Sequence, residues 1–240
     1  MAAINDENNN AVEHLLLGRP SDAVATLLGA LEKSRNTSEL HESNHLERHV
    51  LYSVEMTYEI PESEQPALPF LWYGRPIAIS SSEDDISGDV AMTVYNPQIA
   101  LAVILYNIGI AVQLECVYPQ CRPKNAPRRT HKDAIDAYVL ALIALMAVPQ
   151  STQPAQLCSL GDRLGVGLLH LATVNNLLFM YAQTVDFTGV TNCLATLSES
   201  LAMICHGMPV EHMKEFAIFL QNTFMFPSDT PIRLAMAPAA

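Results

Sequence analysis

Apolar residues recur at every third or fourth position along much of the chain. This spacing places them on one face of a helix, so it predicts helices that pack through that face. Near the N-terminus it predicts two short helices within residues 11–31, separated by Gly18-Arg19-Pro20-Ser21, with Ser21 capping the second. Further along it predicts helices over residues 97–117, 131–147, 163–184, 187–205 and 209–224.

The region between these two sets of helices follows another pattern. From Val50 to Tyr58 every second residue is apolar, which is typical of a strand. Residues 70–79 and 90–95 have extended character as well, and Asn96-Pro97 is suited to begin the next helix. Residues 38–49 resemble a helix that is very polar. The sequence therefore predicts strands inserted between two helical regions.

Three segments share one spacing of residue sizes. A small residue is followed by a large one four positions later and by a second small residue three positions after that. In the last segment the third position holds a large residue instead of a small one. Another helix precedes each segment, and 12 residues separate Ala11 from Ala23 and Leu178 from Val190. The members of the pattern are Ala23, Leu27 and Ala30, then Ala134, Tyr138 and Ala141, then Val190, Leu194 and Leu197.

The helices that precede these segments add a second pattern. Tyr106-Asn107-Ile108-Gly109 is close to the aromatic-Asn-Leu-Gly of the tetratricopeptide repeat (TPR) family, and Asn176-Leu177-Leu178 repeats its register. In this register and in its small residues the chain resembles that family of helix-turn-helix units. The middle unit would carry a 13-residue insertion, which coincides with the basic, proline-containing segment 121–129. The chain departs from the family in lacking the proline that ends each unit.

This resemblance implies a fold and a division of the chain. The expected fold is mainly α, with antiparallel helix pairs stacked as a short TPR-like right-handed superhelix and a small extended or β insertion near residues 50–95. The expected parts are an N-terminal helix pair (1–37), an acidic, partly extended insertion (38–95), a helical repeat core with a capping helix (96–226) and a loose tail (227–240).

Charge is distributed unevenly between these parts. Charged residues make up 16% of a chain that is 50% hydrophobic, and the net charge is −12. Residues 1–89 contain 16 acidic and 5 basic residues, whereas residues 90–240 contain 9 and 8. A net negative charge repels phosphate backbones, so we expect no nucleic-acid partner. The charge-poor second region is typical of helices buried between stacked neighbours.

Long uncharged windows also raise the question of a membrane. The window between Asp89 and Glu115 is interrupted by Asn96, Pro97 and Asn107. Its apolar part is about 14 residues long, whereas a spanning helix needs about 20, so we expect buried helices and no membrane. The first residues show no leader pattern, and the five cysteines form no C-x-x-C. We therefore expect an intracellular protein, cytoplasmic or nuclear.

The resemblance also implies a binding surface. In TPR proteins the first helix of each unit lines a concave groove that binds extended peptides. Asparagine side chains there can pair with a peptide backbone because each amide both donates and accepts, or they can pack between repeats. The expected function is a non-catalytic protein-protein interaction or scaffold module that binds a peptide or helix without a cofactor. The expected groove residues are Tyr106, Asn107, Ile110, Asn175, Asn176, Phe179 and Gln183.

One motif supports an alternative function. His41-Glu42-Ser43-Asn44-His45 matches H-E-x-x-H, in which two imidazoles one helical turn apart bind zinc and the glutamate acts as general base. His49 would extend the same helical face as a third ligand. The alternative is thus a zinc-dependent hydrolase using His41, Glu42 and His45. The polar surroundings of the motif favour a solvated helix and a chance match, so we expect no catalytic or metal site.

Two further features leave alternatives open. A basic loop contains Arg122, Lys124, Arg128, Arg129 and Lys132. It is either a contact for an acidic partner or for the acidic residues 1–89, or a solvated loop. The charge-poor helices could also pack against a second subunit, which would make the protein a homo-oligomer.

Overall fold

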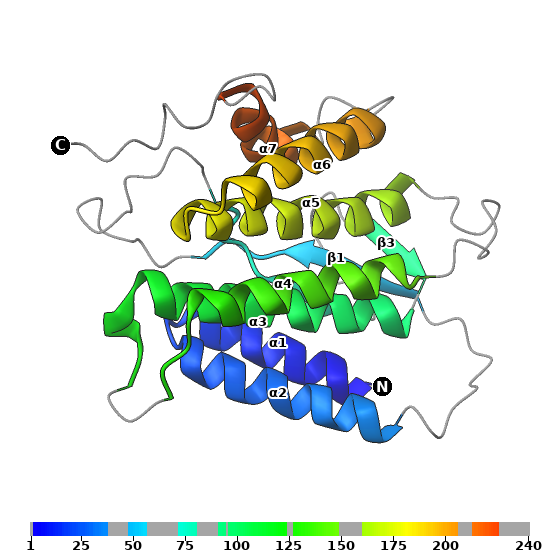
Figure 1. Cartoon of the computed structure of the whole chain (residues 1–240). Coiled ribbons are helices and arrows are strands. Elements are labelled where there is room, and N and C mark those ends of the chain that lie inside the picture. Colours follow the sequence, from blue (N-terminus) through cyan, green and yellow to red (C-terminus); the bar gives the residue numbers. More distant parts are fainter. Residues whose placement is uncertain are drawn as a thin grey trace.

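A computed structural model describes residues 2–37, 48–56, 72–80, 91–94, 96–123, 127–148, 160–205 and 213–225 (Figure 1). Within these ranges the chain is mainly helical, as the sequence predicts. The helices are α1 (Ala2–Leu16), α2 (Pro20–Thr37), α3 (Pro97–Val117), α4 (His131–Met146), α5 (Leu160–Gln183), α6 (Phe187–Cys205) and α7 (Met213–Met225). The expected tail, residues 227–240, lies outside the described residues.

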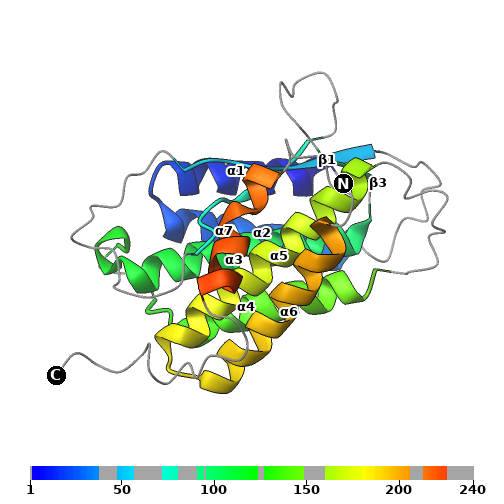
Figure 2. The ribbon, with the colours of Figure 1, turned by 90° about the horizontal axis from the view of Figure 1, so that it is seen from above.

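The helices pack in chain order. Each helix contacts the one before it, and contacts also join α1 to α3, α3 to α5 and α5 to α7. In Figure 1 the stack runs from α1 and α2 at the bottom to α6 and α7 at the top, and Figure 2 shows the same helices from above. We call α1, α3, α5 and α7 the inner helices, and α2, α4 and α6 the outer helices.

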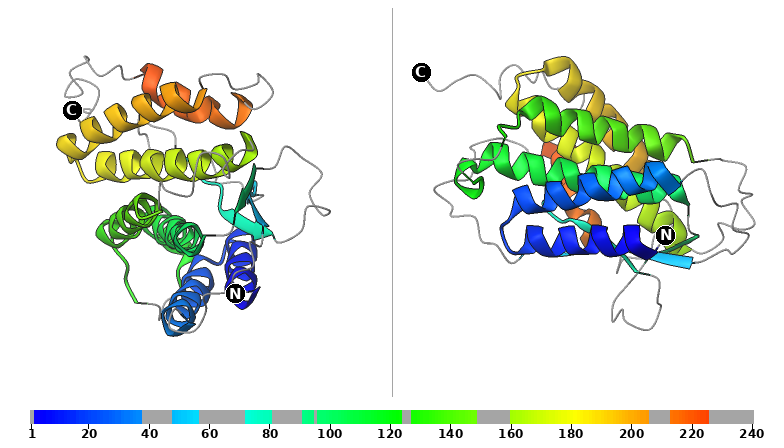
Figure 3. Two further views of the ribbon diagram at one scale, coloured as in Figure 1. Left: turned by 90° about the vertical axis from the view of Figure 1, so that its right-hand side faces the viewer. Right: turned by 90° about the horizontal axis from the view of Figure 1, so that it is seen from below.

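Three short strands form one antiparallel sheet. They are β1 (Arg48–Ser53), β2 (Ile77–Ser80) and β3 (Ala91–Val94), in the order β2-β1-β3. Each strand overlaps one of the three extended segments predicted from the sequence, although residues 54–56 and 72–76 lie outside the strands. Strand β2 contacts α1 and α3, while β1 and β3 contact α5, so the sheet covers the inner helices (Figure 3). The sheet therefore brings an inserted segment onto the helices that are expected to line a groove.

Two predictions near the N-terminus are wrong. Helix α1 begins at Ala2, well before residue 11, because Ile4 and Asn8 continue its buried face toward the N-terminus. Asn8 is fully buried, and a polar residue at such a position hides the helical pattern. Ser21 does not cap α2, since that helix begins at Pro20; its hydroxyl instead donates a hydrogen bond of 2.5 Å to Glu115 on α3.

The connections within two helix pairs have the same geometry. The amide of Gly18 donates to the carbonyl of Leu15, and the amide of Arg19 donates to the carbonyl of His14. These two hydrogen bonds end α1 in a Schellman motif. Gly18 has φ 68°, and Val185 takes the equivalent place after α5 with φ 59°. The turn at the end of α5 therefore forms even though its residue lacks the conformational freedom of glycine.

Small residues allow close contact between helices. A Cβ atom added to Gly109 on α3 would lie 2.4 Å from the ring of Tyr138 on α4, so only glycine fits beneath that ring. Ala23, Ala30, Ala134 and Ala141 are all fully buried between helices.

Two helices are long and apolar enough to cross a membrane by length and composition: Pro97–Val117 and Gly165–Gln183. Most of each hydrophobic window, 89% and 78%, is buried inside the protein. Burial of this extent is typical of the core helices of soluble proteins, which pass the same test, so the two helices are weak grounds for a membrane protein.

Candidate functional site

Three asparagines hold an extended segment of the same chain, residues 72–80, against the inner helices. Each asparagine accepts a hydrogen bond from the amide of one residue and donates one to the carbonyl of that same residue. Asn9 on α1 pairs with Ile79 at 3.0 and 2.7 Å. Asn107 on α3 pairs with Ile77 at 2.9 and 2.7 Å. Asn176 on α5 pairs with Tyr73 at 2.8 and 3.0 Å. We call these three side chains the asparagine ladder.

The ladder follows from the repeat register. Asn9, Asn107 and Asn176 each stand two residues before one of the positions aligned as Ala11, Gly109 and Leu178. Because α1, α3 and α5 lie next to one another, equivalent positions on them form a row. The three side-chain amides therefore lie in a row along the extended segment, where they bind residues 79, 77 and 73.

The ladder takes the place of a fourth strand. In an antiparallel pair, alternate residues direct their amide and carbonyl groups to opposite sides of the strand. The carbonyl of Pro76 accepts from the amide of Val54, just beyond β1, at 2.9 Å, so Ile77 and Ile79 face away from β1. Their polar groups would form an unpaired sheet edge without the asparagines. Asn107 and Asn9 thus close that edge.

A second layer of hydrogen bonds fixes the ladder side chains. Asn107 also donates to the side chain of Asn8 at 2.9 Å, and Asn8 donates to the carbonyl of Ile77 at 3.1 Å. The hydroxyl of Tyr106 donates to the carbonyl of Arg75 at 3.0 Å. Burial raises the pKa of Tyr106 well above its ordinary value, so its phenol stays neutral and able to donate.

The expected groove residues are therefore not open to solvent. Tyr106, Asn107, Ile110, Asn175, Asn176 and Phe179 are 0–2% exposed, and Gln183 is half-buried. The inserted segment contacts several of them, and Trp72 packs against Phe179 with ring centroids 6.3 Å apart. Asn175 behaves differently from its neighbour, because it accepts a hydrogen bond of 2.6 Å from Asn222 on α7 and so packs between helices. Asn176 thus binds the main chain of a segment of the same chain, whereas Asn175, one residue away, binds a neighbouring helix.

Sequence reasoning missed Asn8 and Asn9. An asparagine stands two residues before Ala11, as Asn107 stands two residues before Gly109, but the apolar pattern of this helix begins only at Ala11. The position two residues before the small residue, which is Asn107 in α3, corresponds to Asn9 in α1.

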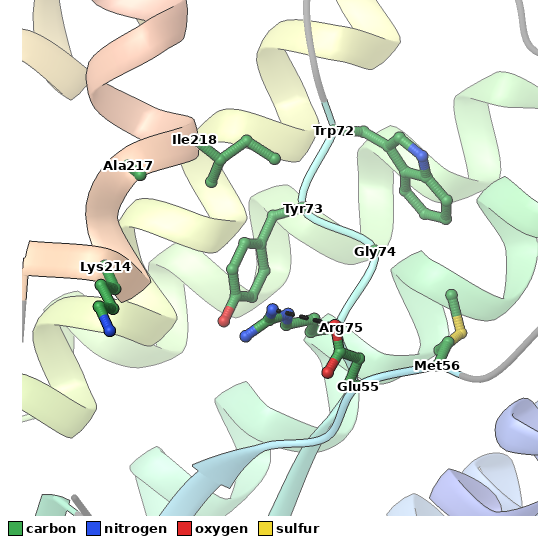
Figure 4. A pocket seen from close by; sticks show the side chains of 9 residues that line it. All are labelled: Glu55, Met56, Trp72, Tyr73, Gly74, Arg75, Lys214, Ala217 and Ile218. Atoms are coloured by element: carbon green, nitrogen blue, oxygen red, sulfur yellow. Dashed lines mark hydrogen bonds and ion pairs between the residues drawn. The ribbon is translucent and has the colours of Figure 1, made fainter.

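A pocket of about 400 Å³ lies at the Trp72 end of the segment (Figure 4). It is formed by the chain after β1, by residues 72–75 and by the first turns of α7. Arg75 contacts Glu55 at 3.5 Å within it. The lining residues are Glu55, Met56, Trp72, Tyr73, Gly74, Arg75, Lys214, Ala217 and Ile218.

The basic loop contributes one internal ion pair. Arg129 donates to the carboxylate of buried Glu115 at 2.6 Å, and the same oxygen accepts from Ser21. This network joins α2, α3 and the loop before α4. Lys132 lies in α4 and pairs with Asp136 one turn later. Arg122 is half-buried, Arg128 is exposed, and Lys124 lies outside the described residues.

The zinc motif receives no support from the part of the chain that the structure describes. His41, Glu42 and His45 lie outside it, and the backbone of His49 belongs to strand β1, so His49 does not continue a helix from His45. The prediction of a helix through residues 48 and 49 is wrong, because these residues pair with β3. No group of three metal-binding side chains occurs among the described residues.

Two of the thiols that the structure describes, Cys116 and Cys193, are poorly suited to nucleophilic chemistry. Burial raises the pKa of Cys116 to about 11 and that of Cys193 to about 12. Both are therefore protonated at neutral pH, and a protonated thiol is a weak nucleophile. The only ring nitrogen contact described for a histidine joins His170 to the hydroxyl of Ser200 at 3.1 Å.

No protein-family model, no curated protein and no solved structure matches this chain.

Proposed function

We propose that the chain is a non-catalytic protein-interaction or scaffold module, built as a short TPR-like right-handed superhelix. In this proposal α1, α3 and α5 form a groove for an extended polypeptide. The packing of helices in chain order and the shared turn of two helix pairs support the superhelix.

The observation that carries the proposal is the asparagine ladder. Its three side chains make paired hydrogen bonds to the main chain of a bound segment, at 2.7–3.0 Å. Such contacts do not depend on the sequence of the segment. Peptide-binding domains that add a strand to a sheet edge work in the same way, with main-chain bonds for affinity and side-chain pockets for specificity.

The chain itself supplies the occupant in the folded protein. A partner therefore competes with a tethered segment, whose effective concentration is on the order of millimolar. Ile77 and Ile79 of that segment are buried against the helices. The partner expected is thus an extended peptide with branched apolar residues at alternate positions.

A weakened occupant tests this proposal. Replacing Ile77 and Ile79 by serine removes two buried side chains, each contributing about 2 kcal/mol, but leaves the ladder intact. A fluorescein-labelled peptide with the sequence of residues 72–80 is then added, and its anisotropy is measured. We expect saturable binding to this double variant and much weaker binding to the wild-type chain.

Two further variants in the same background provide the controls. Asn107→Ala should abolish peptide binding, whereas Asn10→Ala, at an exposed position on α1, should not. If the double variant retains its helical circular dichroism but binds no peptide, the proposal is wrong. The single variant Ile79→Ser serves the same test if the double variant does not fold.

A further inference from the structure

Helix α1 contains another buried asparagine, one turn before Asn9. Asn5 is 7% exposed, and its side-chain oxygen is buried without a hydrogen-bond partner among the residues that the structure describes. A buried acceptor of this kind costs free energy unless a donor reaches it. Asn8 and Asn9, by contrast, both bind the main chain of the inserted segment. Asn5 therefore offers an acceptor to which the described part of the segment supplies no donor.

The place of Asn5 on the helix directs it toward the inserted segment. Successive residues of a helix are about 100° apart, so Asn5 projects between Asn8 and Asn9 when viewed along the helix axis. Asn8 donates to the carbonyl of Ile77 at 3.1 Å, and Asn9 pairs with Ile79. Asn5 thus faces strand β2 from the next turn of α1.

Strand β2 leads toward this turn. Figure 1 shows β1 running in the same direction as α1, and β2 is antiparallel to β1. Strand β2 therefore runs toward the start of α1, and it ends at Ser80. Residues two apart in a strand are separated by about 6.8 Å, and one helical turn separates Asn9 from Asn5 by about 6 Å. In a longer strand, the residue two places after Ile79 would thus reach Asn5.

Strand β1 extends past the end of β2 in the same direction. It begins at Arg48, two residues before Val50, which pairs with Ser80. A strand two residues longer than β2 would therefore pair with β1 over the full length of β1. Its first added residue, like Ile77 and Ile79, would direct its amide away from β1. That amide would point toward α1, the side on which Asn5 lies.

We propose that the partner of the groove is an extended peptide whose strand continues at least two residues past the place of Ser80. Asn5 accepts a hydrogen bond from the amide of the first of these residues, next to the three positions of the asparagine ladder. The added contact favours the partner over the tethered segment, whose described part leaves Asn5 without a donor. This inference rests on the proposed function, because it concerns the same groove.

Peptides of two lengths test the proposal in the double variant Ile77→Ser and Ile79→Ser. The short peptide has the sequence of residues 72–80, and the long peptide carries two further alanines at its C-terminus. Both are labelled with fluorescein, and their anisotropy is measured. We expect the long peptide to bind at least about fivefold more tightly than the short one.

A third peptide removes one proton from the long peptide. It carries N-methylalanine at the first added position, so it has no amide hydrogen for Asn5 and should bind no more tightly than the short peptide. If it binds as tightly as the long peptide, the role of Asn5 is wrong, while binding of the short peptide still supports the proposed function. If none of the three peptides binds, both proposals are wrong.

Asn5→Leu separates binding from stability. In the double variant it should remove the advantage of the long peptide and leave binding of the short peptide unchanged. In the wild-type chain it should leave the thermal unfolding midpoint unchanged or raise it, because leucine replaces an acceptor that has no donor. Asn8→Leu is the matched control, since Asn8 bonds to both Ile77 and Asn107, and it should lower the midpoint by at least about 3 °C. A similar decrease in Asn5→Leu would show that Asn5 stabilises the chain's own fold, and would overturn the proposal.

Discussion

Helices α3 and α4 are neighbours in the chain and in space, yet they bury different kinds of side chain. Helix α3 is covered by α1, α2, α4, α5 and β2, and it buries residues all around its axis, including the polar Asn107, Gln113 and Glu115. Helix α4 buries mainly alanines on one face, together with Tyr138. Its other face exposes Leu140, Ile143 and Met146, which are 49%, 50% and 75% exposed.

This difference explains the low charge of α3. A helix enclosed on every side has no position for an unpaired charge, so Glu115 is held by Arg129 and Ser21. Of the other polar residues that α3 buries, Asn107 binds the main chain of the inserted segment, and Gln113 accepts a hydrogen bond from Tyr138 on α4. The inner helix is therefore specialised for holding an extended chain, and the outer helix for covering it.

The largest loss of stability is expected where α3 and α4 meet. Gly109→Ala places a methyl group 2.4 Å from the fully buried ring of Tyr138, which has no room to move. We expect a loss of roughly 3 kcal/mol in the free energy of unfolding, measured by urea denaturation.

Gly189→Ala is the matched control for this substitution. Its added methyl group would lie 2.5 Å from the ring of Tyr181, which is only half-buried and can turn toward solvent. We expect a loss below about 1 kcal/mol. Equal losses at the two glycines would show that burial of the ring does not control the cost.

A smaller loss is expected in the asparagine ladder. Asn107→Ala leaves the buried amide of Ile77 without its acceptor and should cost about 2 kcal/mol. Asn9→Ala at the half-buried end of the ladder should cost less than about 1 kcal/mol, because water can replace the lost side chain. Urea denaturation measures the free energy of unfolding of both variants. A larger loss for Asn9→Ala than for Asn107→Ala would contradict the claim that α3 makes the strongest contacts to the segment.

The inner helix α5 offers a test by pH. Burial lowers the pKa of His170 below its ordinary value of 6.5, so the folded state binds fewer protons than the unfolded state. Stability from this residue is therefore full above pH 6.5 and falls as the pH drops through the lower folded pKa. Unfolding of the wild type and His170→Gln is measured from pH 7 down to about pH 5, a range in which histidine titrates. His170→Gln should lose less stability than the wild type as the pH falls. If the free energy of unfolding falls equally with pH in both proteins, His170 is not the cause of the pH dependence.

The smallest effect is expected on the outer face of α4. Ile143→Gln should change the free energy of unfolding by less than about 0.5 kcal/mol, since the side chain is already half exposed. Light scattering of the same variant tests the expectation of a homo-oligomer. A dimer in the wild type that dissociates in Ile143→Gln would show that this face contacts a second subunit.

The sequence predicted the helices whose ends carry local signals. Helix α3 begins at Pro97 after the capping residue Asn96, and both ends of α3 and α6 agree with the predicted ranges. The sequence pattern also singles out Gly109 and Tyr138, although it does not predict their contact. These features depend on short-range periodicity, which a sequence shows directly.

The occupant of the groove could not be predicted in the same way. Asn107 pairs with Ile77, thirty residues away, and Asn176 pairs with Tyr73, over a hundred residues away. Such long-range hydrogen bonds depend on which extended segment reaches the helices. The local pattern of apolar and polar residues does not determine this. The extended character of residues 70–79 does not indicate which surface they cover.

Hydrogen exchange at β2 tests the central claim most directly. If the ladder pairs with the outer edge of β2, the amides of Ile77 and Ile79 exchange slowly in the wild type. In Asn107→Ala the amide of Ile77 should lose protection, while that of Ala78, which faces β1, keeps it. Rapid exchange at Ile77 and Ile79 in the folded wild-type chain would contradict the account.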